Sequence, residues 1–150
     1  MNEGSPIPDV SITVADGTRV SLASLAGPLV VYFYPKDDTA GCTREAQDFG
    51  RLAPDFQAAG VRVIGVSKDT PATHAKFIAK HGLAVELASD EDGSVCEAFG
   101  VWGEKQLYGR TYMGIERATF LFGADGRLKR QWRKVRVPGH AEAVLDAARA

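Results

Sequence analysis

Apolar and polar positions alternate along the first part of the chain in the pattern of a β-hairpin. Residues 10–14 and 19–22 flank the pair Asp16-Gly17, a dipeptide typical of tight hairpin turns. Residues 29–34 then form a continuous β-branched and aromatic run, which predicts a strand buried on both faces. Pro35 ends this run. The pattern therefore predicts an N-terminal β-hairpin followed by a central strand.

Helical and strand-like segments alternate along the rest of the chain. Residues 43–59 show the apolar spacing of a helix, and Gly60 follows as a helix stop. Pro54 is expected to bend or divide this helix because it has no backbone N–H to donate. Further strands are predicted over 61–66, 85–87, 118–122 and 128–135, and further helices over 71–81, 93–99 and 140–148.

This alternation predicts an α/β fold. Strands that alternate with helices of this length favour a central mixed β-sheet with parallel β–α–β units and helices on both faces. With 150 residues, 45% of them hydrophobic, the chain is expected to form a single domain, residues 1–150, with a substantial core. Residues 100–116 are rich in glycine and aromatic residues without a clear period, and we interpret them as a long functional loop.

The charge balance argues against nucleic acid and membranes as partners. The formal net charge is −1, too small to create a general attractive field. The basic run within 127–136 alternates with apolar residues and is interpreted as the solvated face of a strand pair. The N-terminus lacks the regions of a signal peptide, and the longest apolar run, 29–34, is too short to span a bilayer. We therefore expect a soluble, cytoplasmic protein.

Residues 34–45, YPKDDTAGCTRE, carry the candidate chemistry. They join a buried strand to the next helix, which is where ligands bind in open α/β sheets. A cysteine in the first turn of that helix faces unpaired backbone N–H groups and the positive end of the helix dipole, which stabilise a thiolate. Its neighbours are small or polar, and we find no apolar periodicity that includes position 42. We therefore expect Cys42 to be a presented nucleophile instead of a buried apolar side chain.

Pro35, Thr39 and Cys42 form the pattern P-x-x-x-T-x-x-C, and here the sequence resembles the peroxiredoxin family. Taken alone, Thr39 fits a helix cap equally well and Pro35 fits a strand terminator. The three residues in this order and spacing are more specific. The segments YPKDDTAGCTREAQDF, VIGVSKD and YGRTYMGIERATF are similar to the bacterioferritin-comigratory, or Q-type, branch, and the resemblance runs from about Val10 to the C-terminus.

The resemblance implies a thioredoxin-like fold and the reduction of hydrogen peroxide and alkyl hydroperoxides through a sulfenic acid, without a cofactor. It implies that Cys42 is the peroxidatic cysteine, Thr39 a hydroxyl partner, Pro35 a shield over the thiolate and Arg117 the cation that completes the site. The physical chemistry agrees, because cleavage of an O–O bond requires an aligned nucleophile and donors for the charge on the departing oxygen. An arginine offers both a permanent charge and a planar fork of donors.

Glu45 is a possible supporting residue. We expect its carboxylate to reach back towards Thr39, Arg117 or the helix-start amides, in the manner of a capping box. The alternative for Arg117 is a surface ion pair with Glu45 or Glu116.

The three histidines offer no metal site. His74, His81 and His140 have no metal-ligand spacing with each other or with the cysteines. No metal is therefore expected, and we interpret these histidines as surface or helix-end residues.

The sequence departs from the resembled branch at the step that regenerates the thiol. A second cysteine normally condenses with the sulfenic acid to form a disulfide, and in that branch it often lies five residues after the first or on the following helix. This chain has Gln47 and Ile78 there. Its only other thiol, Cys96, is expected to be half-buried and inert on a short helix. Two schemes remain: one cysteine with thioredoxin or another thiol as reductant, which we favour, or Cys96 as an atypical resolving partner of Cys42.

Two further functions are compatible with the same fold. A thioredoxin-like disulfide oxidoreductase uses C-x-x-C, where this chain has Cys42-Thr43-Arg44-Glu45. A non-catalytic chaperone or binding module would instead use exposed aromatic residues such as Trp102, Tyr108 and Tyr112, and the intact motif argues against it. The protein is expected to be a monomer or a weak homodimer.

Overall fold

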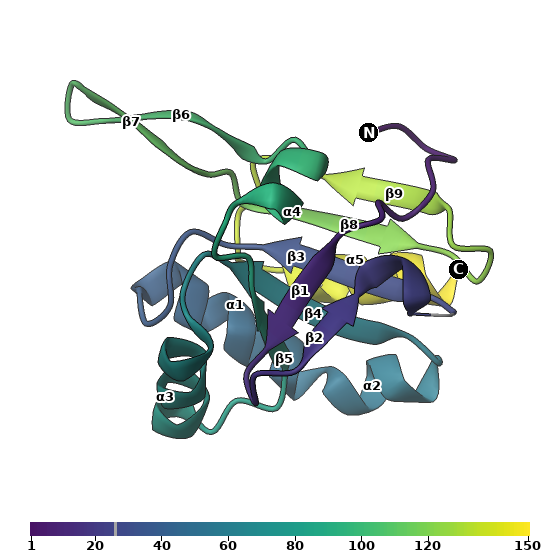
Figure 1. The fold of residues 1–150 in the computed structure, drawn as a ribbon. Coiled ribbons are helices and arrows are strands. Elements are labelled where there is room, and N and C mark those ends of the chain that lie inside the picture. The colour runs from purple at the N-terminus through teal and green to yellow at the C-terminus, as the bar shows by residue number, and fades with distance from the viewer. Residues whose placement is uncertain (26) are drawn as a thin grey trace.

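A mixed seven-stranded sheet forms the centre of the protein. The computed structural model describes residues 1–25 and 27–150, and its main sheet has the strand order β2-β1-β5-β4-β3-β8-β9 (Figure 1). The α/β class, the mixed sheet and the N-terminal hairpin are therefore as predicted. The strands of this sheet are β1 (Ser11–Val14), β2 (Arg19–Ser21), β3 (Leu29–Phe33), β4 (Arg62–Ser67), β5 (Glu86–Ser89), β8 (Ala118–Phe122) and β9 (Leu128–Trp132).

Strand β3 is the most enclosed element and carries the candidate site at its carboxyl end. It pairs in parallel with β4 and antiparallel with β8, so that Val31 lies opposite both Ile64 and Phe120. All five of its residues are buried. Because side chains alternate along a strand, Val31 packs in the hydrophobic cluster of one sheet face, whereas Tyr32 packs in that of the other. This explains the unbroken apolar run in the sequence.

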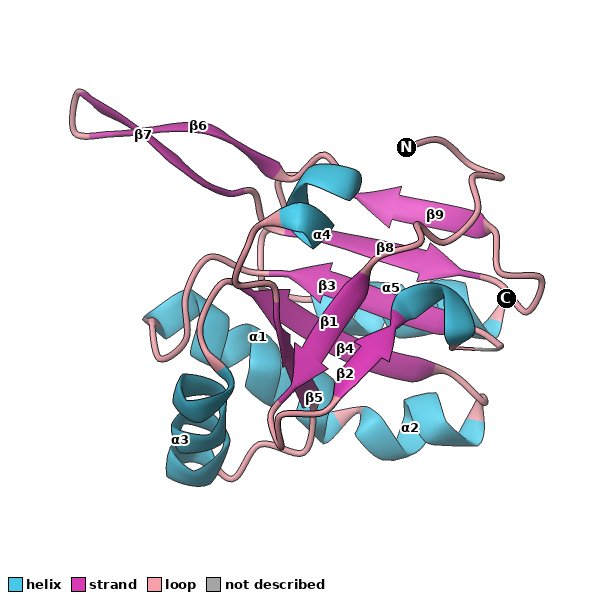
Figure 2. Ribbon diagram, viewed as in Figure 1, coloured by secondary structure: helices cyan, strands magenta, loops and turns pink. Residues whose placement is uncertain are grey.

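The helices cover the two faces unequally. Four of them, α1 (Ala40–Arg51), α2 (Ala53–Ala58), α3 (Pro71–His81) and α5 (His140–Arg149), contribute to the cluster that contains Tyr32. The short helix α4 (Ser94–Ala98) packs in the cluster of the opposite face (Figure 2). Pro54 lies in the first turn of α2, where its missing N–H costs no hydrogen bond. The expected helix over 43–59 is therefore divided, and it begins at Ala40.

The segment 100–116 is not the long loop that we expected. It forms a second, two-stranded sheet from β6 (Trp102–Leu107) and β7 (Arg110–Ile115), and this hairpin extends away from the main sheet (Figure 1). Most of its side chains are exposed or half-buried on both faces. Because neither face is consistently buried, the alternation that identifies a strand is absent from the sequence.

No helix among the described residues is both long enough and apolar enough to cross a membrane.

Candidate active site

Cys42 lies in the first turn of α1, as the sequence predicts, but its side chain is buried. Only 2% of the residue is exposed, so the expectation of a presented thiol is wrong in this respect. Cys42, Ala46 and Phe49 occupy positions i, i+4 and i+7 and join one hydrophobic cluster, which is the spacing of a buried helix face. The sequence analysis missed this period because the two small residues give a weak apolar signal.

Arg117 connects Cys42 to Glu45. It lies between β7 and β8, and its Nη2 donates a hydrogen bond to Cys42 Sγ at 3.3 Å, while its Nη1 donates to Glu45 Oε1 at 2.6 Å. Gly41 makes this approach feasible, because a Cβ there would lie only 3.3 Å from Arg117 Nη2. Glu116 instead bonds Arg133. The ion pair of Arg117 with Glu45 thus exists, but it is partly buried instead of lying at the surface, since Glu45 is buried and Arg117 half-buried.

Glu45 is buried with one oxygen unpaired. Its side chain is 2% exposed, and Oε2 has no hydrogen-bond partner among the described residues. Burial raises the pKa of Glu45 to about 7, although the neighbouring Arg117 acts in the opposite direction. Glu45 therefore contacts Arg117, one of the three partners we expected for it.

This raised pKa predicts a loss of stability as the pH rises. Between pH 4.5 and about 7 the folded protein holds the Glu45 proton more firmly than the unfolded chain does, so the free energy of unfolding falls across this range. Glu45→Gln has no such proton and should not show this fall. Above pH 7 we expect the variant to be the more stable of the two, by an upper bound on the order of 3 kcal/mol.

Urea unfolding of both proteins between pH 4 and 8 measures this difference. Asp55→Asn, at an exposed carboxylate on α2, is the control and should track the wild type. A constant gap between wild type and Glu45→Gln at every pH would contradict the prediction.

Thr39 and Pro35 lie beside the site. Among the described residues, neither makes a hydrogen bond to Cys42. Thr39 directly precedes α1 and is exposed, and its hydroxyl donates to the carbonyl of Lys36 at 2.9 Å. It makes no side-chain cap bond to the helix. Pro35 is half-buried and lines the same cavity as Arg117. Thr39 therefore occupies the N-cap position of α1, but its hydroxyl stabilises the preceding loop instead of capping the helix.

A buried polar network holds the loop that carries these residues, and the sequence analysis missed it. Asp37 accepts hydrogen bonds from the Tyr34 hydroxyl at 2.5 Å and lies 2.6 Å from Nδ1 of His74. Its backbone N–H donates to Asp69 at 2.9 Å. The run of four polar residues after Pro35 resembles an ordinary solvated loop, so only the neighbouring elements of the fold reveal that Asp37 is enclosed.

Two of the three histidines are buried, so the interpretation as surface residues is wrong for these two, whereas His140 begins α5 and His81 ends α3, as expected of helix-end residues. His74 is fully buried, and His140, although at the start of α5, is 7% exposed. Nε2 of His140 lies 2.8 Å from the Thr119 hydroxyl, and burial, followed by the charge of Arg117, lowers its pKa to about 4. In the described chain no group of three or more histidine, cysteine, aspartate or glutamate side chains could hold a metal ion.

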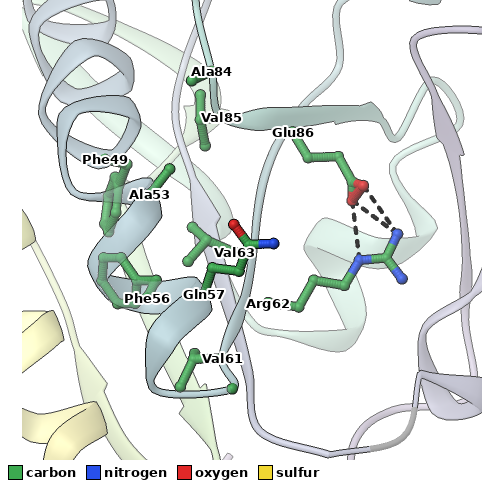
Figure 3. Close-up of a pocket in the computed structure, with 11 residues that line it drawn as sticks. Phe49, Ala53, Phe56, Gln57, Val61, Arg62, Val63, Ala84, Val85 and Glu86 are labelled. Carbon is green, nitrogen blue, oxygen red and sulfur yellow. Dashed lines mark hydrogen bonds and ion pairs between the residues drawn. The ribbon is translucent and has the colours of Figure 1, made fainter.

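Two cavities differ in their relation to this chemistry. One, of about 520 Å³, is lined by Pro35 and Arg117 together with residues of the β6–β7 hairpin. The other, of about 370 Å³, lies between α2 and strand β4 and has the Arg62–Glu86 ion pair at its edge (Figure 3). Its lining includes none of the candidate site residues, so the first cavity is the one relevant to the site.

Cys96 lies on the opposite face of the sheet from Cys42. It belongs to the cluster that contains Val31, whereas Cys42 belongs to the cluster that contains Tyr32. Cys96 is fully buried instead of half-buried, and burial, reinforced by a hydrogen bond to Asp90, raises the pKa of its thiol. In this conformation it is therefore a poor thiolate.

Comparisons with known proteins agree in identifying the family. The model of the AhpC/TSA family matches residues 4–131. The chain is 48% identical over 143 residues to Peroxiredoxin Bcp of Xanthomonas campestris, covering 95% of this chain and 89% of that protein. It is 43% identical over 144 residues to Peroxiredoxin Bcp of Bacillus subtilis, covering 95% and 92%.

Solved structures give the same answer. The bacterioferritin comigratory protein of Xanthomonas campestris, studied for its alkyl peroxide reduction activity, superposes with a TM-score of 0.89 at 44% identity and covers 98% of this chain and 97% of its own. A cysteine mutant of Xylella fastidiosa PrxQ superposes with a TM-score of 0.91 at 40% identity, covering 97% and 94%. The thioredoxin-like fold implied by the resemblance is thereby confirmed. The chain belongs to the AhpC/TSA family, among its peroxiredoxins of the Bcp, or Q, type.

Proposed function

We propose that Cys42 reduces hydroperoxides as the thiolate of a thiol-dependent peroxidase. The observation that carries the proposal is the Arg117 fork, which joins Cys42 Sγ to Glu45 at the start of α1. The sulfur attacks the outer oxygen of R–O–O–H, so that an S–O bond forms and the O–O bond breaks. Cys42 becomes a sulfenic acid, and the departing oxygen of the peroxide takes up a proton to leave as an alcohol or water.

Each neighbour has a distinct part in this step. Arg117 holds the thiolate and offers N–H groups to the charge that grows on the peroxide oxygens. The Thr39 hydroxyl donates a hydrogen bond to the Lys36 carbonyl, so the lone pairs of its oxygen are free to accept a hydrogen bond from the peroxide O–H. Pro35 lines the same cavity as Arg117 and keeps water from the sulfur. The Glu45 carboxyl sets the orientation and the charge balance of Arg117.

We further infer that an external thiol reduces the sulfenic acid. Cys42 and Cys96 belong to clusters on opposite faces of the sheet, whereas a disulfide needs α-carbons within about 7 Å. Two structures of Xanthomonas campestris Peroxiredoxin Q carry single cysteine-to-serine changes at two positions that lie 36 residues apart. In this chain the residue 36 positions after Cys42 is Ile78, which has no thiol. Thioredoxin is the protein reductant we propose, and small thiols are expected to replace it in an assay.

We also propose that the protein acts in the cytoplasm. A reducing cytoplasm supplies such thiols, and both cysteines are free. We propose a monomer or weak homodimer as the working form. A disulfide oxidoreductase is not favoured, because Cys42 has no second thiol at the spacing of that chemistry.

The oxidised protein should accumulate as a sulfenic acid on Cys42. We expect mass spectrometry after one equivalent of hydrogen peroxide, with dimedone as the trap, to find the adduct on Cys42 and an unmodified Cys96. Excess peroxide without reductant should carry Cys42 on to the sulfinic acid, because no nearby thiol intercepts the sulfenate.

Cys96→Ala is the matched control and should give the same adduct yield. A peptide that crosslinks Cys42 to Cys96 in the wild type would overturn the one-cysteine scheme and make Cys96 the resolving residue. An unmodified Cys42 would instead overturn the proposed peroxidase function.

Thr39 should contribute through its hydroxyl and not through helix capping. Thr39→Val keeps the shape but removes the acceptor, and the rate constant for peroxide should fall roughly 10-fold or more, the equivalent of one hydrogen bond to a reacting group. Thr39→Ser keeps the hydroxyl and should stay within a few-fold of wild type. The measurement is the single-turnover rate of Cys42 oxidation. Equal rates for Thr39→Val and wild type would reduce Thr39 to a loop residue.

A further inference from the structure

The cavity beside Arg117 is lined by two lysines, Lys105 and Lys134, that the reaction described above does not use. Lys105 on β6 lines this cavity of about 520 Å³ together with Pro35 and Arg117. It is half-buried, unlike an ordinary surface lysine. A cation in this place shares a cavity with Arg117, whose Nη2 donates a hydrogen bond to Cys42 Sγ.

The position of Lys105 is set by the opposite strand of the hairpin. A Cβ at Gly114 on β7 would lie 2.9 Å from Lys105 Cδ, so the absence of a side chain there gives the lysine stem its path. Lys105 Nζ then donates to the carbonyl of Ile115 at 2.9 Å, two residues before Arg117. The ammonium group is thereby held on the strand that leads directly into the active-site arginine.

The charges of the site act on Lys105. Burial and then the charge of Arg117 lower the pKa of Lys105, while Cys42 and Glu116 act in the opposite direction. The result is a stronger acid than an exposed lysine. An arginine retains its proton throughout the accessible pH range, so Lys105 is chemically distinct from Arg117 in this respect.

The reaction requires an acid at this place. When the O–O bond breaks, the departing oxygen leaves as alkoxide or hydroxide, a strong base whose departure is accelerated by a proton in the transition state. Glu45 is bound to Arg117, and its free oxygen is buried. His140 is bound to Thr119 in the interior. Two lysines, Lys105 and Lys134, also line the cavity. Of these, Lys105 is half-buried and hydrogen-bonded to the strand that leads to Arg117, whereas Lys134 is exposed.

We propose that Lys105 donates this proton to the departing oxygen, a role that rests on the proposed peroxidase function. The Cys42 thiolate, R–O–O–H and the Lys105 ammonium yield the Cys42 sulfenic acid, R–OH and a neutral Lys105 amine. Sulfur is oxidised by two electrons, the peroxide is reduced by two, and the amine regains its proton from solvent.

Oxidants with different leaving groups test this role. Hydrogen peroxide and tert-butyl hydroperoxide release strong bases, whereas peracetic acid releases acetate, which is stable without a proton. In single-turnover measurements by tryptophan fluorescence, for which Trp102 lines the cavity, Lys105→Met should slow the first two about 100-fold and change peracetic acid by less than about threefold. Lys105→Arg keeps the charge without the acidity and should show the same selective loss.

Two further variants sharpen the result. Gly114→Ala should reproduce the selective loss by displacing the lysine stem. Lys129→Met is the matched control, because Lys129 is also a strand lysine whose ammonium donates to backbone carbonyls, and all three oxidants should react with it as with wild type. The rate with peracetic acid reports whether each variant retains a folded site.

The outcomes separate this role from the proposed function. Equal slowing of all three oxidants by Lys105→Met, or wild-type rates in Lys105→Arg, would overturn proton donation while leaving the peroxidase intact. A wild-type protein that reacts with none of the oxidants would overturn the peroxidase and the role of Lys105 with it.

Discussion

Cys42→Ser should abolish peroxide consumption in the presence of dithiothreitol. A serine hydroxyl is not ionised at neutral pH, and even as an alkoxide it would not form a stable oxygen-bonded product that a thiol reduces. The replacement also removes the sulfur that accepts a hydrogen bond from Arg117 at 3.3 Å. We therefore expect no turnover above the uncatalysed rate, measured as loss of hydrogen peroxide at pH 7.

Cys96→Ala is the control for this experiment and should retain full turnover with dithiothreitol. Cys96 is fully buried in the cluster that contains Val31, and alanine keeps a small apolar side chain there, so any loss should appear in stability. If Cys96→Ala lost turnover while remaining folded, the division of roles between the two cysteines would be wrong. If Cys42→Ser kept turnover, the nucleophile would have to lie elsewhere.

The fold could be predicted from the sequence wherever one face of an element is buried. The run that becomes β3 and the helix over Pro71–His81 carry strong periodic signals, and both form with nearly the expected bounds. The β6–β7 hairpin could not be predicted in this way. Its two strands pair with each other and are largely exposed, so no burial pattern marks them, and glycine at 103, 109 and 114 indicates a loop instead.

The sequence predicts which residues form the candidate site better than it predicts how deeply they are buried. Cys42 was proposed from its place at a helix start, Arg117 was implied by the resemblance to the peroxiredoxins, and Glu45 was a possible supporting residue. The structure brings these three together. The burial of Cys42 and the enclosure of Asp37 by His74 depend on helices α1 and α3 packing against the sheet. Such long-range packing leaves little trace in the local sequence, because the same polar residues occur in exposed loops.

The guanidinium of Arg117 makes two contacts that a lysine at this position could not make together. One guanidinium reaches Cys42 Sγ at 3.3 Å and Glu45 Oε1 at 2.6 Å through two different nitrogens. A lysine ammonium is a single point of charge and cannot span both partners in this planar arrangement. It could keep the contact with only one of the two partners, Glu45 or Cys42.

Arg117→Met should therefore lower the second-order rate constant for peroxide by about 10²- to 10³-fold, the usual cost of removing one preset donor to developing charge. Arg117→Lys should lie between this variant and wild type. Stopped-flow rates of Cys42 oxidation provide the measurement. Arg62→Lys is the matched control, because the Arg62 guanidinium also binds a carboxylate, that of Glu86 (Figure 3), at a cavity that neither Cys42 nor Arg117 lines. It should react at the wild-type rate. If Arg117→Lys also reacted at that rate, charge alone would suffice, and the planar fork would have no part in peroxide reduction.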